Sequence, residues 1–300
     1  MRKLEVWAPD GLPEVAAGDD LAAVVLSGLA DGADLADGDI VAVTSKVVSK
    51  AEGRTRVGER DAAIEEETVR VVARRGATRI VRNRLGLTMA AAGVDASNVA
   101  VGAIVLLPLD PDHSARVLRR EIRARTGVNV AVIVTDTAGR AWREGQTDLA
   151  IGAAGLVVAE DFAGRTDPHG NPLAVTLPAV ADELAGAAEL AQGKLAARPV
   201  AVLRGRADLV LPPGDDGAGA ISLVRPDGGD MFGWGAREAV VRALAGVDAD
   251  RAPFGAPAPA EELAVALGRL PDGADRTALA AVCFAHGWRL EDWQACLDDA

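Results

Sequence analysis

The chain has 300 residues, of which 49% are hydrophobic and 25% are charged, and this balance excludes intrinsic disorder over most of its length. Its 32 Lys and Arg against 44 Asp and Glu give a formal net charge of −12, which excludes the basic footprint typical of nucleic-acid or anionic-lipid binding. Two cysteines are too few for a disulfide framework, the first residues show no signal-peptide pattern, and no apolar run approaches the length of a membrane span. We therefore expect a soluble, cytoplasmic protein that binds neither nucleic acid nor membrane.

Hydrophobic spacing and turn residues predict ten elements in the first 203 residues. In chain order these are strand 4–8, helix 21–29, strand 40–43, helix 61–75, strand 103–107, helix 112–126, strands 128–135 and 156–159, helix 179–192 and strand 199–203. The helix over 61–75 would bury Ile64, Val69 and Val72, and the helix over 112–126 would be capped by Asp112 or Ser114. The inner face of the second helix would consist of Val117, Leu118 and Ile122. Because helices and strands alternate irregularly and without repeat, we expect a mixed α/β (α+β) fold that is not a regular Rossmann array.

A Pro- and Ala-rich segment at 252–260 predicts a linker, followed by three short helices over 261–270, 275–286 and 290–298. The predicted organisation is therefore a catalytic domain over 1–250 and a linker with a small helical tail over 251–300. So short a tail buries little surface alone, and we expect it to pack on the body of the protein or across a dimer. We also expect it to be dispensable for the chemistry.

The segment 134–148 carries the most informative polar side chains. Asp136 and Thr137 follow an apolar run, so Asp136 is expected at the carboxyl end of a strand, where sites in α/β proteins gather. A carboxylate beside a hydroxyl offers two hard oxygen ligands that suit Mg²⁺ or Mn²⁺. Arg140 and Arg143 provide planar guanidinium groups for carboxylate or phosphate. The alternative is a turn whose Asp caps backbone amides and whose arginines lie on the surface.

Two further segments place short polar or cationic groups beside apolar runs. Asp95 and Asn98 precede the strand at 103–107, and a carboxylate there that met Asp136 would make a shared metal site. The alternative at Asp95 is an Asx turn. Ser45 and Lys50 follow the strand at 40–43, and Lys50 is a candidate point charge for phosphate. The alternative there is a solvated loop, since lysine is usually exposed.

Gly193 and Lys194 do not form a Walker A loop. That motif requires Gly-x4-Gly-Lys-Ser/Thr after a strand, whereas here six residues separate Gly186 from Gly193, Leu195 replaces the hydroxyl, and a predicted helix precedes the glycine. Any contact of Lys194 with phosphate therefore needs another geometry. The three histidines and two cysteines lack zinc-type spacing, which favours packing roles for Cys283 and His286.

Taken together, these segments resemble the coenzyme F420-0:L-glutamate ligase (gamma-glutamyl ligase) family. The resemblance rests on 11–13, 39–53, 93–98, 107–112 and 135–155, which occur in family order, and it extends over about residues 4–240. It is nearest to the actinobacterial form, without the C-terminal nitroreductase-like domain to which that form is often fused. The resemblance implies a ligase fold without a P-loop, and a homodimer.

The activity implied by the resemblance is GTP-dependent ligation of L-glutamate to coenzyme F420-0 through an acyl phosphate, forming F420-1 or a longer gamma-glutamyl tail. It implies Mg²⁺ or Mn²⁺ as cofactor, with K⁺ as a further candidate cation. Carried over residue by residue, the metal ligands are Asp95, Asp136 and Thr137. The GTP contacts are Leu12, Pro13, Glu14, Val15, Ser45, Lys50 and Asn98. Archaeal members have an acidic, glycine-rich segment near Gly193 and Lys194 that meets nucleotide and metal, whereas this chain has a lysine there.

The residue inventory fits this chemistry, because activating a carboxylate by phosphorylation needs a metal and cationic donors and no protein nucleophile. Arg140 and Arg143 are the candidate catalytic groups that hold carboxylates, and Lys194 is a further candidate for phosphate. Two other functions remain open. A flavin-dependent reductase would give a coloured protein, and a non-catalytic nucleotide-binding subunit would release no GDP in the presence of glutamate.

Overall fold

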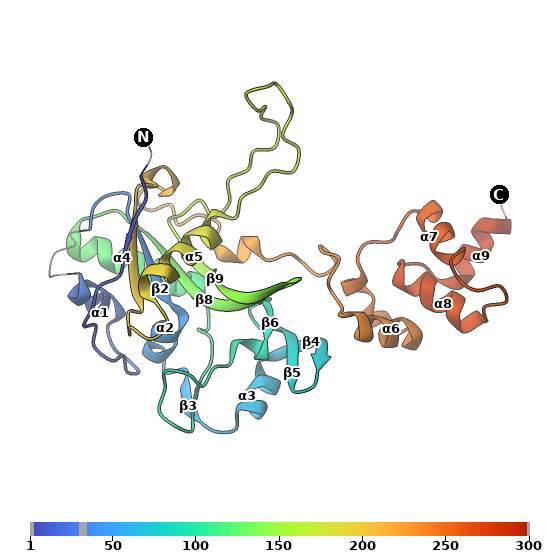
Figure 1. The fold of residues 1–300 in the computed structure, drawn as a ribbon, viewed down its shortest axis with the longest axis horizontal. Coiled ribbons are helices and arrows are strands. Elements are labelled where there is room, and N and C mark those ends of the chain that lie inside the picture. Colours follow the sequence, from blue (N-terminus) through green and yellow to red (C-terminus); the bar gives the residue numbers. More distant parts are fainter. Residues whose placement is uncertain (1–2, 30–34, 299–300) are drawn as a thin grey trace. The chain divides into compact units, whose positions relative to one another are not determined.

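The computed structural model describes residues 3–29 and 35–298, which fall into two compact units. The first unit combines the chain up to Glu67 with Gly93–Val224, and the second combines Thr68–Ala92 with the chain from Arg225 onward (Figure 1). The structure is a mixture of helices and sheets, which confirms the predicted mixed α/β class. Among the described residues, no helix combines the length and apolarity needed to cross a bilayer.

The first unit is built on a five-stranded sheet in the order β1-β10-β2-β8-β9. Its strands are β1 (Glu5–Trp7), β2 (Ile40–Thr44), β8 (Ala131–Arg140), β9 (Arg143–Ala154) and β10 (Val200–Arg204). Only β2 and β8 pair in parallel, and the other three pairings are antiparallel, so the sheet differs from a Rossmann array as predicted. Residues Ile40 to Val43 of the central strand are completely buried, which explains why they form an uninterrupted apolar run.

Helices cover both faces of this sheet. The helix α5 (Val180–Gln192) packs Val180, Leu184 and Ala188 against Ile40 and Ile133 on one face. The helix α4 (Pro111–Thr126) lies against the other face, where a Cβ added to Gly152 of β9 would come within 2.4 Å of the Pro111 backbone. The remaining elements of this unit are α1 (Leu21–Gly28), α2 (Ser45–Ala51), α3 (Arg60–Glu67) and the two-stranded sheet of β3 (Thr55–Val57) with β7 (Ala103–Val105).

The start of α4 differs from the prediction. Its N-cap is Asp110, whose Oδ1 accepts a hydrogen bond from the His113 amide at 2.9 Å, with Pro111 in the first turn. Asp112 is instead buried, and its Oδ1 accepts from the amides of Ala153 and Ala220 at 2.7 Å each. Val117, which was expected to face inward, is 39% exposed.

Two other predicted elements were wrong. The helix expected over 61–75 ends at Glu67, and Thr68–Arg75 forms β4, which pairs with β5 (Thr78–Asn83) across a turn at Gly76. The β-branched residues of this segment make the strand, and Val69 is consequently 68% exposed although Val72 is buried. The strand expected over 156–159 is a single bridge between Leu156 and Val210.

The second unit contains a three-stranded sheet and the helices of the chain's last quarter. The sheet consists of β4, β5 and β6 (Thr88–Ala90), and the helices are α6 (Ala236–Ala245), α7 (Ala260–Leu267), α8 (Arg276–Ala285) and α9 (Leu290–Asp298). The three tail helices enclose a small core around Leu263, Cys283 and Leu290, and α8 also packs on α6. The functional division at residue 250 stays a prediction, but the tail shares one compact unit with 68–92 and 225–250.

Candidate functional site

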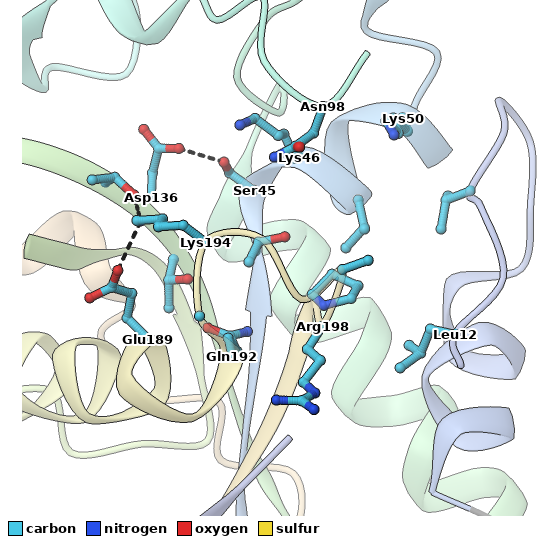
Figure 2. Close-up of a pocket in the computed structure, with 18 of the residues that line it drawn as sticks. Leu12, Ser45, Lys46, Lys50, Asn98, Asp136, Glu189, Gln192, Lys194 and Arg198 are labelled. Atoms are coloured by element: carbon cyan, nitrogen blue, oxygen red, sulfur yellow. Dashed lines mark hydrogen bonds and ion pairs between the residues drawn. The ribbon is translucent and has the colours of Figure 1, made fainter. Parts of the chain in front are cut away.

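The first unit contains a cavity of about 580 Å³ at the ends of several of its elements. Five parts of the chain line it: the loop after β1, the end of β2 with α2, the loop 98–100 before β7, the middle of the β8–β9 hairpin, and the end of α5 with the loop that follows (Figure 2). The predicted site residues in its wall are Leu12, Pro13, Glu14, Val15, Ser45, Lys50, Asn98, Asp136, Thr137, Gly193 and Lys194. The lining residues run from Leu12 to Pro199, so segments up to 187 positions apart (199 − 12) meet in one cavity.

Asp136 lies in the middle of a strand, not at its end as predicted. Strand β8 continues to Arg140 because β9 pairs with it along this extension, whereas its parallel partner β2 ends opposite Thr135. Asp136 is the first residue of β8 past the end of β2, and its side chain lines the cavity. Its Oδ1 accepts a hydrogen bond from the Ser45 hydroxyl at 2.7 Å.

The environment of Asp136 disfavours its charged form. Burial is the largest cause and, together with the nearby Asp148 and Asp95 carboxylates, raises its pKa to about 6, against opposing effects of Ser45 and Lys46. Ionising Asp136 beside two other carboxylates costs free energy, and a bound cation would offset that cost.

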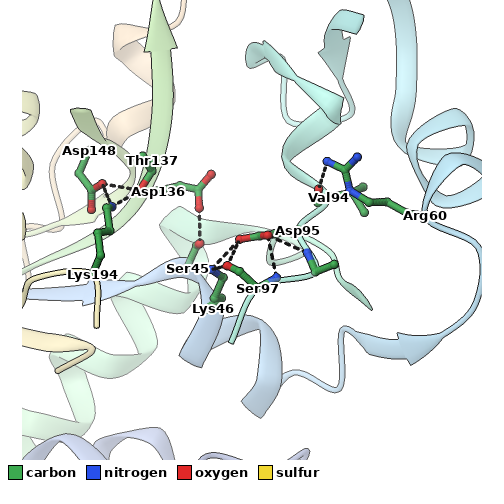
Figure 3. A network of polar contacts seen from close by, with 11 residues as sticks. Ser45, Lys46, Arg60, Val94, Asp95, Ser97, Asp136, Thr137, Asp148 and Lys194 are labelled. Atoms are coloured by element: carbon green, nitrogen blue, oxygen red, sulfur yellow. Dashed lines mark hydrogen bonds and ion pairs between the residues drawn. The ribbon is translucent and has the colours of Figure 1, made fainter. Parts of the chain in front are cut away.

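Asp95 does not line the cavity but reaches it through Lys46. The Lys46 ammonium lies 2.6 Å from Asp95 Oδ2 and 2.7 Å from the Ser97 hydroxyl (Figure 3). Asp95 Oδ1 accepts from the amides of Ala96 and Ser97, so the Asx turn considered as an alternative is present. Burial would raise the pKa of Asp95, but hydrogen bonds from Lys46 and Ser97 hold it below its ordinary value.

A second cation lies on the opposite side of Asp136. The Lys194 ammonium is 2.8 Å from Thr137 Oγ1, 3.0 Å from Glu189 Oε1 and 3.5 Å from Asp148 Oδ1. Thr137 in turn donates to Asp148 Oδ1 at 2.6 Å (Figure 3). The Asp148 side chain is only 5% exposed, and these partners offset the cost of burying its carboxylate.

Lys50 faces the cavity from the far end of α2. Its side chain is only 13% exposed and forms an ion pair with Glu14 in the loop after β1. It is therefore not the solvated lysine of the alternative interpretation. An anion entering the cavity would find this ammonium together with Lys46 and Lys194, which compensates locally for the acidic chain.

Arg140 and Arg143 are not brought into the cavity wall. They pair with each other across the turn between β8 and β9, both are exposed, and Arg140 Nη2 donates to the Glu144 carbonyl at 3.1 Å. The prediction placed them near the metal ligands because they are close in sequence. In a strand, however, each residue adds about 3.3 Å of distance from Asp136.

Several residues of the wall were missed by sequence reasoning: Asp148, Glu189, Gln192 and Arg198. Asp148 stands opposite Thr137 in the β8–β9 register, a relation that no sequence spacing reveals. Gln192 is 3% exposed, and within the described part of the chain neither its side-chain nitrogen nor its oxygen has a hydrogen-bond partner. An unpaired buried carboxamide is costly, which makes Gln192 a candidate contact for a ligand.

The predicted metal ligands fit a cation unequally. The carboxylates of Asp136 and Asp95 are hard oxygen donors, and Asp95 is near enough to raise the pKa of Asp136, which suits Mg²⁺ or Mn²⁺. The Thr137 hydroxyl is already engaged by Asp148 and Lys194. Among residues 3–29 and 35–298, no three His, Cys, Asp or Glu side chains gather closely enough to hold a metal by themselves.

Comparison with known proteins finds one family in the same region. The model of the F420-0:Gamma-glutamyl ligase family matches residues 11–205, which include the whole cavity wall. A protein of Halobacterium salinarum named coenzyme F420:L-glutamate ligase is 41% identical over 216 residues, covering 64% of this chain and 82% of the relative. Proteins of the same name from Archaeoglobus fulgidus and Methanopyrus kandleri are 39% and 40% identical, each covering 64% of this chain and 83% of the relative.

Proposed function

Because this chain belongs to the F420-0:gamma-glutamyl ligase family, we propose that it joins L-glutamate to coenzyme F420-0 by an amide bond in coenzyme F420 biosynthesis. The observation that carries this proposal is the cavity of the first unit. It combines the partly buried carboxylate of Asp136 with three ammonium groups, and all its lining residues lie within the matched range. A site of this kind suits the transfer of a phosphoryl group between two anionic partners.

We further propose that GTP activates the acceptor. The γ-phosphoryl group passes from GTP to the terminal carboxylate of F420-0, which gives GDP and an acyl phosphate. The amine of glutamate then attacks the acyl carbon, the C–O bond to phosphate breaks, and the amide forms with release of phosphate and a proton. No step needs a protein nucleophile, so the residues of the cavity bind, orient and neutralise charge.

The proposal gives a task to several groups in the wall and to Asp95 beside it. Lys50 and Lys46 would hold phosphate oxygens, and Asp136 with Asp95 would hold the divalent cation. Such a cation would supply positive charge that offsets the negative charge of the transferring phosphoryl group. The loop of Leu12 to Val15 and Asn98 line the part of the cavity proposed for the rest of GTP.

The remaining expectations from family resemblance stay proposals. We propose that Arg140 and Arg143 hold carboxylates of the acceptor or of glutamate, from the turn of the β8–β9 hairpin. We also propose a cytoplasmic homodimer, with K⁺ as a further candidate cation.

The direct test is incubation of the full chain with F420-0, GTP, glutamate and Mg²⁺ or Mn²⁺, read by mass spectrometry. The expected product is heavier by one or more glutamyl units, with one GDP released per unit added. Binding of GTP without glutamate-dependent GDP release would indicate a nucleotide-binding subunit and contradict the proposal. A product formed equally well with no nucleotide would contradict the acyl-phosphate step.

Lys50→Ala is expected to weaken GTP binding at least about tenfold, because one hydrogen-bonded charge pair contributes roughly 1.5–3 kcal/mol. Glutamate affinity should change much less. Isothermal titration calorimetry with each ligand measures both effects, and Lys3→Ala, at a lysine whose side chain is 67% exposed outside the cavity, is the control. Equal loss of both affinities would argue against a phosphate contact.

Gln192→Leu is expected to stabilise the ligand-free protein by about 1–3 kcal/mol, because it removes a buried carboxamide without hydrogen-bond partners. The same change should weaken GTP binding if the carboxamide recognises the nucleotide. Urea unfolding and calorimetry measure the two effects. A destabilised variant with unchanged GTP affinity would show that Gln192 serves the fold alone.

A further inference from the structure

If Thr137 were a metal ligand, as the family resemblance implies, the metal ion would compete for the place that the Lys194 ammonium occupies. This ammonium contacts oxygens from three elements: Thr137 of β8, Asp148 of β9 and Glu189 of α5. Two carboxylates and a hydroxyl are the hard oxygen set that a small cation prefers. Here a tethered ammonium occupies that set.

The chain is shaped to bring Lys194 there. Helix α5 ends at Gln192, and Gly193 has a positive φ of +64°, a conformation that favours glycine. The turn directs the next side chain back toward its own helix, so that Lys194 reaches Glu189 and then the β8–β9 hairpin (Figure 2). The desolvated Asp148 carboxylate, 5% exposed, is thereby neutralised without any added ion.

Thr137 is the one predicted metal ligand without a negative charge, so it is less able than Asp95 or Asp136 to bind a lysine and a metal ion together. Its hydroxyl donates to Asp148 and accepts from Lys194, and it carries no charge to offset the repulsion between an ammonium and a metal ion. Asp95 also meets a lysine, but its negative charge can serve both Lys46 and a divalent cation. Asp136 accepts from the neutral hydroxyl of Ser45.

We propose that Lys194 is a resident cation that takes the place of a metal ion at Thr137, so that the divalent cation is held by Asp136 and Asp95 and Thr137 is not one of its ligands. This inference rests on the metal of the proposed function. It assigns Thr137, Asp148 and Glu189 to an ammonium site in the cavity wall, beside the place proposed for the phosphates of GTP.

The test is Mn²⁺ binding to the full chain, followed by electron paramagnetic resonance without nucleotide, which is independent of ligase turnover. Thr137→Val is expected to leave Mn²⁺ affinity within about twofold of the unmodified protein. Lys194→Met frees the three oxygens and is expected to add a second Mn²⁺ site, or to tighten binding at least tenfold. Thr137→Val placed in the Lys194→Met background should abolish that gain.

Two controls separate this site from general charge effects. Lys3→Met removes the same charge outside the cavity and should leave Mn²⁺ binding unchanged, and Lys194→Arg keeps the charge and should show no added site. A tenfold loss of Mn²⁺ affinity in Thr137→Val, or no gain in a folded Lys194→Met protein, would overturn the inference. Absence of Mn²⁺ binding in every variant would overturn the metal and this inference together, whereas glutamate ligation is judged separately by mass spectrometry.

Discussion

Asp136→Asn is expected to reduce ligase turnover at least about a thousandfold while making the ligand-free protein more stable. Asparagine keeps the acceptor for the Ser45 hydroxyl but removes the charge proposed to hold the divalent cation. The surroundings raise the pKa of Asp136 to about 6, so ionising this side chain destabilises the folded state. The neutral asparagine does not ionise, and the variant avoids this destabilisation.

The stability difference between Asp136→Asn and the unmodified protein should depend on pH. Below about pH 4 the side chain is protonated in both folded and unfolded chains, so the two proteins should be equally stable. The advantage of Asp136→Asn should grow as pH rises toward 6 and then stay constant at about 1–3 kcal/mol. Urea unfolding at several pH values measures it.

A matched control is Asp182→Asn. Burial also raises the pKa of Asp182, and its Oδ1 accepts from the Ala150 amide at 2.9 Å, but it is absent from the cavity wall. Turnover should be unaffected in this variant. Asp136→Asn with more than about a tenth of normal activity would remove Asp136 from the proposed metal site.

Arg119→Ala is expected to lower the free energy of unfolding by about 3–5 kcal/mol, a large share of the roughly 5–15 kcal/mol by which native proteins are stable. Arg119 is 4% exposed, and its guanidinium joins α4 to the loop that follows β10. It donates to the carbonyls of Val130, Leu211, Pro212 and Asp215 and to the side chains of Asn129 and Asp216. Alanine would leave these acceptors and a cavity behind.

Chemical denaturation followed by circular dichroism measures this loss of stability. The control is Arg120→Ala at the neighbouring, exposed residue, which should change the free energy of unfolding by less than about 0.5 kcal/mol. Arg119→Lys should recover only part of the stability, because an ammonium has three donors and no planar fork. A fully stable Arg119→Ala protein would show that the network contributes nothing net to folding.

The sequence alone was sufficient for most of the first unit's regular elements. Strands such as β2 and β10 are short, fully buried apolar runs, and helices such as α5 repeat apolar residues at helical spacing, so local patterns identify them. Local chemistry also marked Asp136 and Lys50 as functional candidates, because a carboxylate or lysine close to a buried apolar run is chemically informative, and both residues line the cavity.

The sequence misjudged elements whose identity depends on a partner. Residues 68–75 have spacing compatible with a helix, and they become β4 because β5 is available across the Gly76 turn. Strand β8 runs past Asp136 for the same reason, since β9 pairs with the polar extension that no hydrophobic pattern marks. Asp110 caps α4 in place of Asp112, because Asp112 is bound by amides of two distant segments.

Residue types and short spacings thus determined which side chains are candidates for the chemistry, since a carboxylate or an ammonium keeps its character in any fold. Only the tertiary structure decided which of them meet. The β8–β9 register sets Asp148 opposite Thr137, the turn at Gly193 returns Lys194 to both of them, and the hairpin turn leaves Arg140 and Arg143 outside the cavity wall. These are relations between segments that are distant along the chain, and they arise from strand pairing and packing, which local sequence does not encode.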